Sequence, residues 1–449
     1  MTLIASDIER VVVGLGPTGL SCARHLAAQG LRFSVVDSRE TPPGLAALRD
    51  ELPEVPVHTG SFDNPLLDAA SELFISPGVA LSEPALAHAA SRGAALSSDI
   101  DLFADAATAP VLAITGSNGK STVTSLVGDM AARAGLNVGV GGNLGTPALD
   151  LLDAQRALYV LELSSFQLER CSRLKPAVAA LLNISADHMD RYPDLAAYHR
   201  AKQRVFRGAT HVVSNRADLL TQPLLASGMT HWSFGLDVPD IRGFGLRIHQ
   251  GREWLVFEQT PWLAVSELRM VGRHNLENAL AALAIGHAAG LPREAMLASL
   301  RDFGGLPHRC QFIAEINGVD YYNDSKGTNV GASLAAISGL ASDGRKLVLI
   351  AGGDGKAADF APLAASAAQL RAAVLIGRDA ERIAAAMPSS LRILRAQGMR
   401  EAVALAASQS LPGDAVLLSP ACASFDMFED YRHRGDVFAV AVRSMEDPS

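Results

Sequence analysis

Aromatic residues make up only 5% of the 449-residue sequence, and its four cysteines lie far apart, at Cys22, Cys171, Cys310 and Cys422. Because no two of them form a CxxC pair, the sequence indicates neither a zinc site nor a disulfide framework. We expect reduced thiols that are mostly buried.

Long apolar runs and an excess of positive charge are also absent. The first ten residues contain no basic stretch followed by an apolar one, and no apolar run reaches the roughly 18 residues that a membrane-spanning helix needs. We therefore expect a cytoplasmic protein with neither an export signal nor a membrane span. The formal net charge of −8 disfavours general nucleic-acid binding, because phosphate neutralisation requires a cationic surface. An anionic ligand would have to meet local positive groups.

Apolar residues are abundant, at 49% of the total, and they form short strand-like runs with helical stretches between them. This alternation is typical of a parallel α/β sheet. The strand candidates are Val11–Val13, Phe33–Val36 and Leu73–Ile75 in a first series, Val111–Thr115, Tyr159–Leu163, Val178–Leu182 and His211–Ser214 in a second, and Lys346–Ile350, Val374–Ile376, Leu391–Leu394 and Val416–Leu418 in a third.

Three tandem α/β domains follow from these series, and the length agrees with two or three domains. We predict them over residues 1–98, 99–306 and 307–449. Residues 228–268 differ from the rest, because short apolar runs separated by Gly and charged residues suggest a small antiparallel sheet. The Gly- and Pro-containing segment 304–309 is typical of a linker.

The first candidate phosphate site is a GxGxxG motif at residues 14–19, directly after an apolar strand and before a helical pattern. Glycines let the backbone approach a pyrophosphate, whose charge is favoured at a helix N-terminus. Asp37 ends the next strand, where an acid can bind a ribose hydroxyl. The motif alone leaves open a dinucleotide site, another nucleotide site or a purely structural turn.

A second candidate, TGSNGKST at residues 115–122, joins a strand to a helix. Backbone N–H groups of such a loop hold phosphate oxygens, Lys120 neutralises them and Ser121 ligates Mg²⁺, so ATP is the expected ligand. The loop is a shorter variant of the usual GxxxxGK[ST] pattern, because Ile114 stands where the first glycine would be. A solvated lysine on a structural loop is the alternative.

Two further polar side chains are expected at the same carboxyl edge. Glu162 closes a neighbouring strand, and a carboxylate there is well placed to hold Mg²⁺. His188 follows the next strand, in NISADHMD at residues 183–190. A single histidine in this position is a structural residue about as often as a ligand.

The chain resembles the Mur ligase family, through motifs that run in the same order from Gly14 to Tyr431. The motifs are TGSNGKST, ELSSFQLE, NISADHMDRY, VGRHNLENALAA (residues 271–282) and LPHR. GLGPTGLS near the start, NDSKGTN at 323–329 and SPACASFD at 419–426 resemble the members of the family that add D-glutamate. Gly327 and Phe425 occupy positions where relatives often have other residues.

The resemblance implies a Rossmann-like UDP-binding domain, a central P-loop ATPase-type domain and a Rossmann-like C-terminal domain that binds D-glutamate. It implies a ligase of peptidoglycan precursor synthesis that joins D-glutamate to UDP-N-acetylmuramoyl-L-alanine. ATP would supply the energy, and two Mg²⁺ ions would assist. Lys202 matches a lysine that the family carries as a carbamate, whereas composition alone suggests a lysine on a helix surface. We expect a monomer without nucleic-acid or membrane partners.

The resemblance also implies roles for individual residues. Those implied in catalysis are Lys120, His188, Lys202 and Lys326. Those at ATP are Gly116, Ser117, Asn118, Gly119, Lys120, Ser121, Thr122, Asn278, Arg309 and Asp324. Those at the UDP-linked substrate are Gly16, Thr18, Asp37, Ser38, Arg39, Gly78 and Asn143. Those at D-glutamate are Thr328, Lys356, Ser424 and Phe425. The implied metal ligands are Ser121, Glu162, His188 and the carbamate of Lys202.

Four other functions remain as alternatives. An NAD-dependent dehydrogenase would use GxGxxG and Asp37, but it leaves the lysine loop and the third domain unexplained. A regulatory P-loop ATPase would use Lys120 without needing a UDP-sugar domain. A ligase that adds another amino acid, or a folylpolyglutamate synthetase, is the nearest rival, and the N-terminal UDP-type domain disfavours the synthetase.

Overall fold

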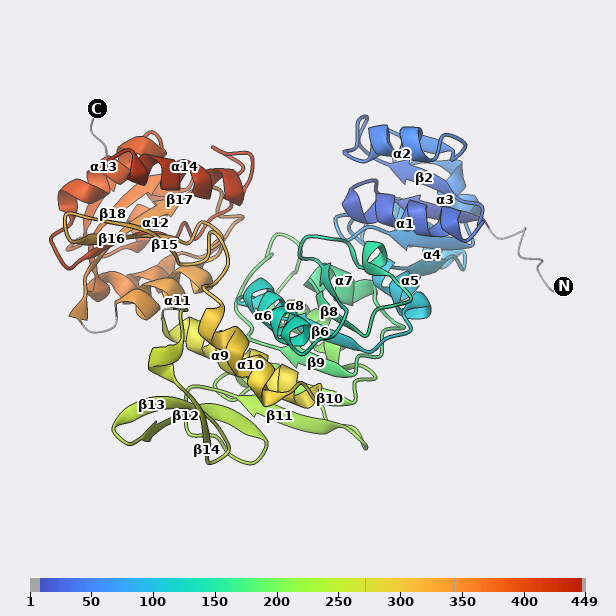
Figure 1. Ribbon diagram of the computed structural model, residues 1–449. Helices are drawn as coiled ribbons and strands as arrows, with labels where there is room; N and C mark the ends of the chain where they lie inside the picture. The colour runs from blue at the N-terminus through green and yellow to red at the C-terminus, as the bar shows by residue number, and fades with distance from the viewer. Residues whose placement is uncertain (1–8, 271, 342–343, 446–449) are drawn as a thin grey trace.

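The computed structural model describes residues 9–270, 272–341 and 344–445. Three separate β-sheets follow one another along the chain, and the central sheet lies between the other two (Figure 1). Val271, the first residue of the VGRHNLENALAA motif, and the two outer ends of the predicted domain ranges lie outside the described residues. The predicted α/β class with three units is confirmed.

The first sheet is five-stranded and parallel, with the order β3-β2-β1-β4-β5. Its strands are β1 (Arg10–Val13), β2 (Ser34–Asp37), β3 (Val57–Thr59), β4 (Glu72–Ile75) and β5 (Ala95–Ser97), and the helices are α1 (Pro17–Ala28), α2 (Leu45–Glu51), α3 (Pro65–Ala69), α4 (Pro84–Ser91) and α5 (Asp99–Ala106). Strand order reverses at β1, which places a crevice at the carboxyl ends of β1 and β4.

The second sheet has nine strands, in the order β14-β13-β12-β11-β10-β9-β6-β8-β7. They are β6 (Val111–Thr115), β7 (Val138–Gly142), β8 (Leu158–Glu162), β9 (Val178–Leu181), β10 (His211–Asn215), β11 (Thr230–Phe234), β12 (Gly243–His249), β13 (Arg252–Phe257) and β14 (Thr260–Ala264). The antiparallel expectation holds for β12, β13 and β14. However, β11 pairs parallel with β10, so the antiparallel strands extend the edge of the main sheet.

Five described α-helices accompany the second sheet, namely α6 (Lys120–Arg133), α7 (Ser165–Arg170), α8 (Leu195–Gln203), α9 (Arg273–Ala288) and α10 (Arg293–Asp302). Helix α6 begins directly after the lysine loop and buries Val123, Leu126, Val127 and Met130, as the sequence pattern predicts. Helix α7 begins with a capping box in which Ser164 and Gln167 satisfy each other's backbone, which fixes its start beside β8.

The third sheet is six-stranded, with the order β15-β16-β20-β17-β18-β19. Its strands are β15 (Gln311–Ile316), β16 (Val319–Asn323), β17 (Leu347–Gly352), β18 (Leu370–Ile376), β19 (Arg392–Arg395) and β20 (Ala415–Leu418), and its helices are α11 (Val330–Leu340), α12 (Ala380–Ala386), α13 (Met399–Gln409) and α14 (Tyr431–Arg443). Only β15 pairs antiparallel among these strands; the others are parallel.

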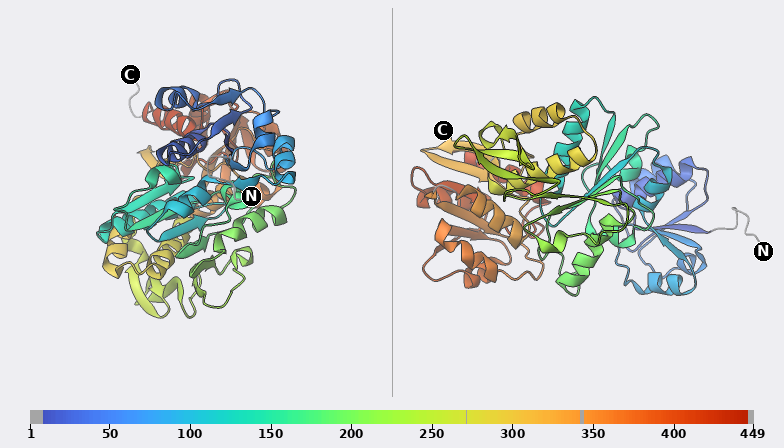
Figure 2. Two further views of the ribbon diagram at one scale, coloured as in Figure 1. Left: turned by 90° about the vertical axis from the view of Figure 1, so that its right-hand side faces the viewer. Right: turned by 90° about the horizontal axis from the view of Figure 1, so that it is seen from below.

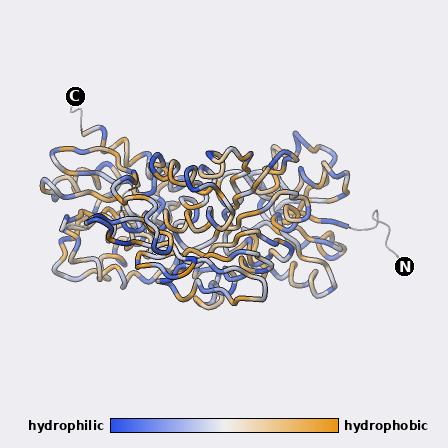
Figure 3. Tube along the Cα trace, turned by 60° about the horizontal axis from the view of Figure 1, so that its bottom comes forward, coloured by the Kyte–Doolittle hydropathy of each residue, from blue (hydrophilic) through white to orange (hydrophobic). Residues whose placement is uncertain are grey.

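Helices cover the sheets in all three units, and the right-hand view of Figure 2 shows the third unit packed against one end of the second. Hydrophobic segments are short and alternate with hydrophilic ones along the trace (Figure 3). Within residues 9–270, 272–341 and 344–445, no helix is both long enough and apolar enough to span a membrane.

Candidate active site

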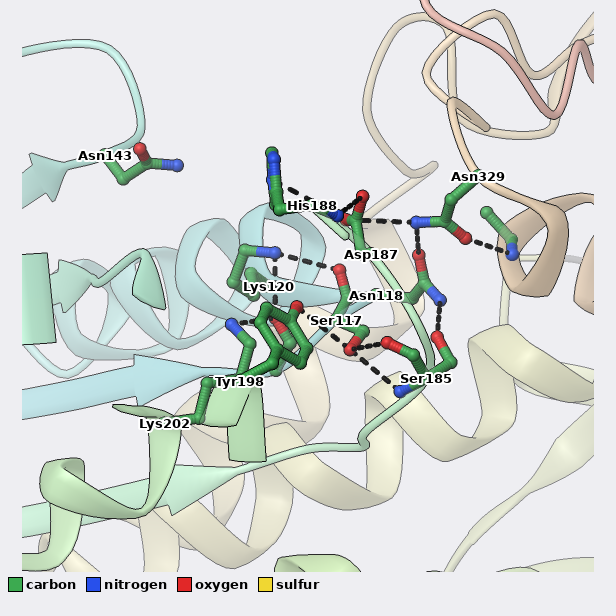
Figure 4. A network of polar contacts seen from close by, with 12 residues as sticks. Ser117, Asn118, Lys120, Asn143, Ser185, Asp187, His188, Tyr198, Lys202 and Asn329 are labelled. Carbon is green, nitrogen blue, oxygen red and sulfur yellow. Dashed lines mark hydrogen bonds and ion pairs between the residues drawn. The ribbon is translucent and has the colours of Figure 1, made fainter. Parts of the chain in front are cut away.

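The lysine loop follows β6, the strand at which the order of the second sheet reverses. Gly119 adopts a left-handed φ of 80°, and a Cβ at this position would lie 2.4 Å from Asn278 Oδ1. Only glycine fits here without displacing Asn278. Lys120 Nζ donates to the carbonyl oxygens of Gly116 and Ser117, both at 2.9 Å, so the ammonium group is held over the loop (Figure 4).

Glu162 lies opposite this loop, at the end of β8, and both of its carboxylate oxygens are engaged. Ser121 Oγ donates to one at 2.6 Å, and Asn143 Nδ2 donates to the other at 2.7 Å. Burial alone would raise the pKa of Glu162, but Lys120 and these two hydrogen bonds outweigh it and lower the pKa. Arg309 reaches across from the third unit and donates to Ser121 Oγ at 2.6 Å. A buried, ionised carboxylate therefore lies beside a hydroxyl and two cations.

Lys202 on α8 is buried, with 1% exposure, so the composition-based interpretation as a surface lysine is wrong. Its Nζ donates to Gly116 O at 2.9 Å and to Thr115 Oγ1 at 3.2 Å, and it lies 4.9 Å from the centre of the Tyr198 ring. Burial, followed by repulsion from Lys120, lowers the pKa of Lys202 well below its usual range. Lys202 is thus a buried amine whose surroundings disfavour its charged form.

His188 adopts a left-handed φ of 58°, an uncommon conformation for a residue other than glycine and one that clusters at functional sites. Its ring meets Phe166 edge-on at 4.9 Å, and burial lowers its pKa. The preceding Asp187 accepts a hydrogen bond from Asn329 of the third unit at 3.3 Å, and Asn329 also donates to Asn118 of the lysine loop at 3.2 Å (Figure 4). Asn329 therefore ties the third unit to the loop.

The third unit contributes two charged side chains from the segment after β16. Lys326 Nζ lies 3.9 Å above the ring of Tyr431, and burial together with Arg309 lowers its pKa to about 8. Asp324 is buried, accepts from Ser419 Oγ at 2.7 Å, and has its pKa raised by burial to about 7. Both groups titrate near neutral pH, which is frequent at active sites.

Lys120, Glu162, His188, Lys202 and Lys326 line a cavity of about 320 Å³ between the second and third units. It brings together every residue that the resemblance assigns to catalysis, to D-glutamate and to the metal ions. Its lining includes Lys120, Ser121, Glu162, His188, Lys202, Lys326, Thr328, Lys356, Ser424 and Phe425. We call it the reaction cavity.

A second cavity of about 260 Å³ shares Asn118, Gly119, Arg309 and Lys326 with the reaction cavity. Asn278 and Asp324, which the resemblance assigns to ATP, line it together with Thr122. The two cavities together contain all of the predicted ATP residues apart from Gly116, which begins the loop.

A third cavity of about 680 Å³ lies at the carboxyl edge of the first sheet. All seven residues predicted for the UDP-linked substrate line it, namely Gly16, Thr18, Asp37, Ser38, Arg39, Gly78 and Asn143. We call it the UDP-type cavity. Asn143 lines the reaction cavity as well, so the two sites are adjacent.

Asp37 has little capacity left for a ribose hydroxyl. One of its carboxylate oxygens accepts from Leu15 N at 2.6 Å, and the guanidinium of Arg39 binds both oxygens. Burial would raise the pKa of Asp37, but Arg39 and the Leu15 N–H lower it. The acid therefore orients Arg39 toward the cavity.

Several lining residues were missed in the sequence. Asp187, Tyr198, Asn329 and Tyr431 line the reaction cavity, and Gln167 lines the third one. Asp187 lies in the NISADHMDRY motif and Asn329 ends NDSKGTN, so the two motifs could have pointed to these residues. Tyr431 begins α14, far along the chain from Lys326, and no spacing rule links the two.

The residues present suit Mg²⁺ only in company with phosphate oxygens. No three His, Cys, Asp or Glu side chains converge to hold a metal ion in the part of the chain that the structure describes. Mg²⁺ commonly uses one or two carboxylates and takes its remaining ligands from substrate phosphates and water. Glu162 and Ser121, 2.6 Å apart beside the lysine loop, fit this pattern.

Comparison with known families covers most of the chain. Residues 8–98 match the family described as Mur ligase MurD-like, N-terminal domain; residues 114–286 match the Mur ligase middle domain; and residues 308–422 match the Mur ligase, glutamate ligase domain. Because the matches assign all three units to Mur ligase domains, they disfavour the alternatives of a dehydrogenase and a stand-alone regulatory ATPase.

Curated relatives match over the full length. Proteins from Pseudomonas syringae pv. tomato, Pseudomonas aeruginosa and Marinobacter nauticus are 59%, 57% and 53% identical, over 99% of this chain and 100% of each relative. Each carries the name UDP-N-acetylmuramoylalanine--D-glutamate ligase.

Solved structures agree on the fold. The UDP-N-acetylmuramate-alanine ligase MurC from Thermotoga maritima is 18% identical over 98% of this chain and all of that chain, with a TM-score of 0.61. The MurF ligase from the same organism, in complex with ADP, is 15% identical over 99% and 98% of the two chains, also with a TM-score of 0.61. With three family domains in order and relatives above half identity along its whole length, the chain belongs to the Mur ligase family.

Proposed function

We propose that this protein is the ATP-dependent ligase that adds D-glutamate to UDP-N-acetylmuramoyl-L-alanine. One observation carries the proposal: the carboxyl edges of all three sheets open into adjoining cavities, and Asn143 lines both the UDP-type cavity and the reaction cavity. A UDP-linked carboxylate bound in one cavity can thus reach a phosphate bound in the next. Relatives of 53–59% identity carry the name of this activity.

In the first step, the alanyl carboxylate attacks the γ-phosphate of ATP, which gives an acyl phosphate and ADP. Two anions must approach each other, so the residues contribute mainly positioning and charge neutralisation. Lys120, Arg309 and Lys326 supply positive charge around the cavity, from the second and third units. The carboxylate becomes an effective acyl donor only after this activation.

In the second step, the amine of D-glutamate attacks the acyl carbon, and phosphate leaves as the amide forms. The amino acid carries two carboxylates, and the third unit offers Lys356, Thr328 and Ser424 to receive them in the reaction cavity. Lys356 also lines the apolar cavity beside this one, of about 460 Å³, so it lies at the rim shared by both. Charge and hydroxyl donors at this end would fix the orientation of the amine.

Ser121, Glu162 and His188 would hold two Mg²⁺ ions in this proposal. When bound, the ions neutralise the charge that builds up on phosphate oxygens. Lys202 would contribute a further oxygen ligand as a carbamate. A neutral amine reacts with CO₂, whereas an ammonium does not, and burial favours the neutral amine of Lys202. The hydrogen-bond partners of Lys202 Nζ, Gly116 O and Thr115 Oγ1, are both neutral.

We further propose a cytoplasmic monomer. All three cavities are formed by a single chain, so the proposed chemistry does not require a second copy. The proposed substrates are nucleotide-linked and amino-acid precursors of the cytoplasmic stage of peptidoglycan synthesis.

The reaction class can be tested with UDP-N-acetylmuramoyl-L-alanine that carries ¹⁸O in its carboxylate. Incubation with ATP, Mg²⁺ and D-glutamate should yield the joined product and one ¹⁸O atom in the released phosphate, because the acyl C–O bond breaks in the second step. Product formation with unlabelled phosphate would contradict the acyl-phosphate route. Absence of the joined product would contradict the ligase itself.

A further inference from the structure

The loop that carries Lys356 has an unusual backbone. Lys356 and Ala357 have φ values of 47° and 60°, so two consecutive residues other than glycine adopt the left-handed conformation. Such a conformation carries strain and persists only where its surroundings hold it. Contacts from elsewhere in the third unit must therefore hold residues 353–358, which include Lys356 of the reaction cavity.

The holding contacts come from Asp379, in the turn after β18, and from Arg382 on α12, and neither residue lines the reaction cavity or the second cavity. Asp379 Oδ2 accepts from Gly355 N at 2.7 Å, and Asp379 N donates to Gly353 O at 3.0 Å. Arg382 donates to Ala358 O at 2.8 Å and to Asp379 Oδ1 at 3.1 Å. The loop is thus fixed before and after Lys356 by Asp379 and Arg382.

The same turn also holds the loop that carries Ser424 and Phe425. Asp426 accepts from Arg378 N at 2.8 Å, and the guanidinium of Arg378 donates to Asp354 at 3.0 Å. The backbone of Asp354 pairs with that of Ala423 in an isolated β-bridge. A Cβ at Gly377 would lie 2.5 Å from Asp426 Oδ2 and 2.9 Å from Gly353, which shows how closely the three segments approach.

We propose that Arg378, Asp379 and Arg382 form a clamp that sets the positions of both loops facing the amino-acid substrate. The clamp residues are positioning residues, since they act through backbone contacts on the loops of Lys356 and Ser424. This inference rests on the proposed function, because the proposed function identifies the amino-acid dicarboxylate as the ligand. Binding of that ligand would depend on the clamp. Asp379 is the central member, with a side chain that is 12% exposed.

Two variants separate the clamp from general stability. Asp379→Leu removes the acceptor for Gly355 N, whereas Asp379→Asn keeps one acceptor oxygen. Arg395→Gln is the matched control, because Arg395 forms an exposed ion pair with Glu381 in the same unit, outside the clamp. Arg382→Gln, at a half-exposed side chain, replaces Asp379→Leu if that variant fails to fold.

The first measurement is steady-state kinetics for each substrate. Asp379→Leu is expected to raise the KM for D-glutamate about tenfold or more, equal to about 1.4 kcal/mol of lost binding, while the KM values for ATP and the UDP-substrate change less than twofold. Asp379→Asn should stay within about threefold of the wild type, and Arg395→Gln should match it. Equal increases for all three substrates, or no increase for D-glutamate, would overturn the clamp.

The second measurement, amide hydrogen exchange without substrates, does not depend on the proposed function. Residues 353–358 should exchange about tenfold faster in Asp379→Leu than in the wild type, while residues 116–122 of the lysine loop should not change. Unchanged exchange at 353–358 would overturn the clamp. If the wild type joins no D-glutamate, the proposed function fails, and exchange still decides whether the clamp holds the loop.

Discussion

At the scale of single residues, Lys326 offers a direct link between structure and pH dependence. Its pKa is lowered to about 8 because it is buried near Arg309 and Lys120. The side chain is therefore charged below about pH 8 and neutral above it. If its charge attracts ATP, kcat/KM for ATP should decline as pH rises through about 8 in the free enzyme.

Lys326→Arg tests this assignment, because a guanidinium stays charged across the range and can also stack on Tyr431. The variant is expected to lose the decline above pH 8 and to retain measurable activity. Initial rates at low ATP between pH 6.5 and 9.5 give the comparison. An alkaline decline with the same midpoint in both proteins would show that another group controls it.

Lys202 provides a second residue-scale prediction. Lys202→Ala should be inactive under ordinary CO₂ and should recover some turnover with added acetate, which supplies the missing anionic oxygen. The measurement is phosphate release against acetate concentration, with the wild type as the control that acetate does not activate. A variant that is fully active without acetate would rule out an essential carbamate.

At the scale of elements, two arginines of the second unit hold the loop after β4. Arg170 on α7 donates to Pro77 O and Val79 O, and Arg191 donates to Gly78 O at 3.2 Å. Three consecutive carbonyls of a segment lining the UDP-type cavity are thus held from another unit. Arg191 also stacks on Phe166, 4.6 Å from its ring centre.

Arg191→Met should therefore weaken the UDP-substrate selectively. We expect its KM to rise about fivefold, as for the loss of one charge-assisted hydrogen bond worth about 1 kcal/mol at a partly exposed site, with the KM for ATP unchanged. Arg133→Met, which removes two ion pairs at the surface, with Asp129 and Asp302, is the control. A parallel rise in both KM values would mean that the contact supports the fold rather than this loop.

At the scale of the whole molecule, the sequence predicted what depends on short-range pattern. Apolar runs located the buried strands β1, β6 and β8, and the residues that follow them lie at carboxyl edges as expected. It missed β7, because its Gly-rich sequence packs few side chains and is held by pairing with β8. It also missed Tyr431 beneath Lys326, and it gave no sign from composition that Lys202 is buried.

The UDP-type cavity lies apart from the lysine loop, so we expect binding of the UDP-substrate to depend on the first unit and ATP chemistry to depend on the second. Lys120→Ala is expected to lower turnover by about 10²- to 10³-fold, while the affinity for the UDP-substrate stays within about twofold. Titration calorimetry without ATP measures that affinity, and Lys175→Ala, at an exposed lysine of the same unit, is the control. An equal loss of UDP-substrate binding would contradict the division.

In the proposed function, the residues at the carboxyl edges of the three sheets together join D-glutamate to the UDP-linked substrate. The most direct measurement is phosphate release from ATP by the purified protein with Mg²⁺ and UDP-N-acetylmuramoyl-L-alanine, in the presence of D-glutamate, L-glutamate, L-lysine or no amino acid. We expect phosphate release with D-glutamate alone. Release with another amino acid would contradict the assignment of the third unit, and release in every mixture would contradict the ligase.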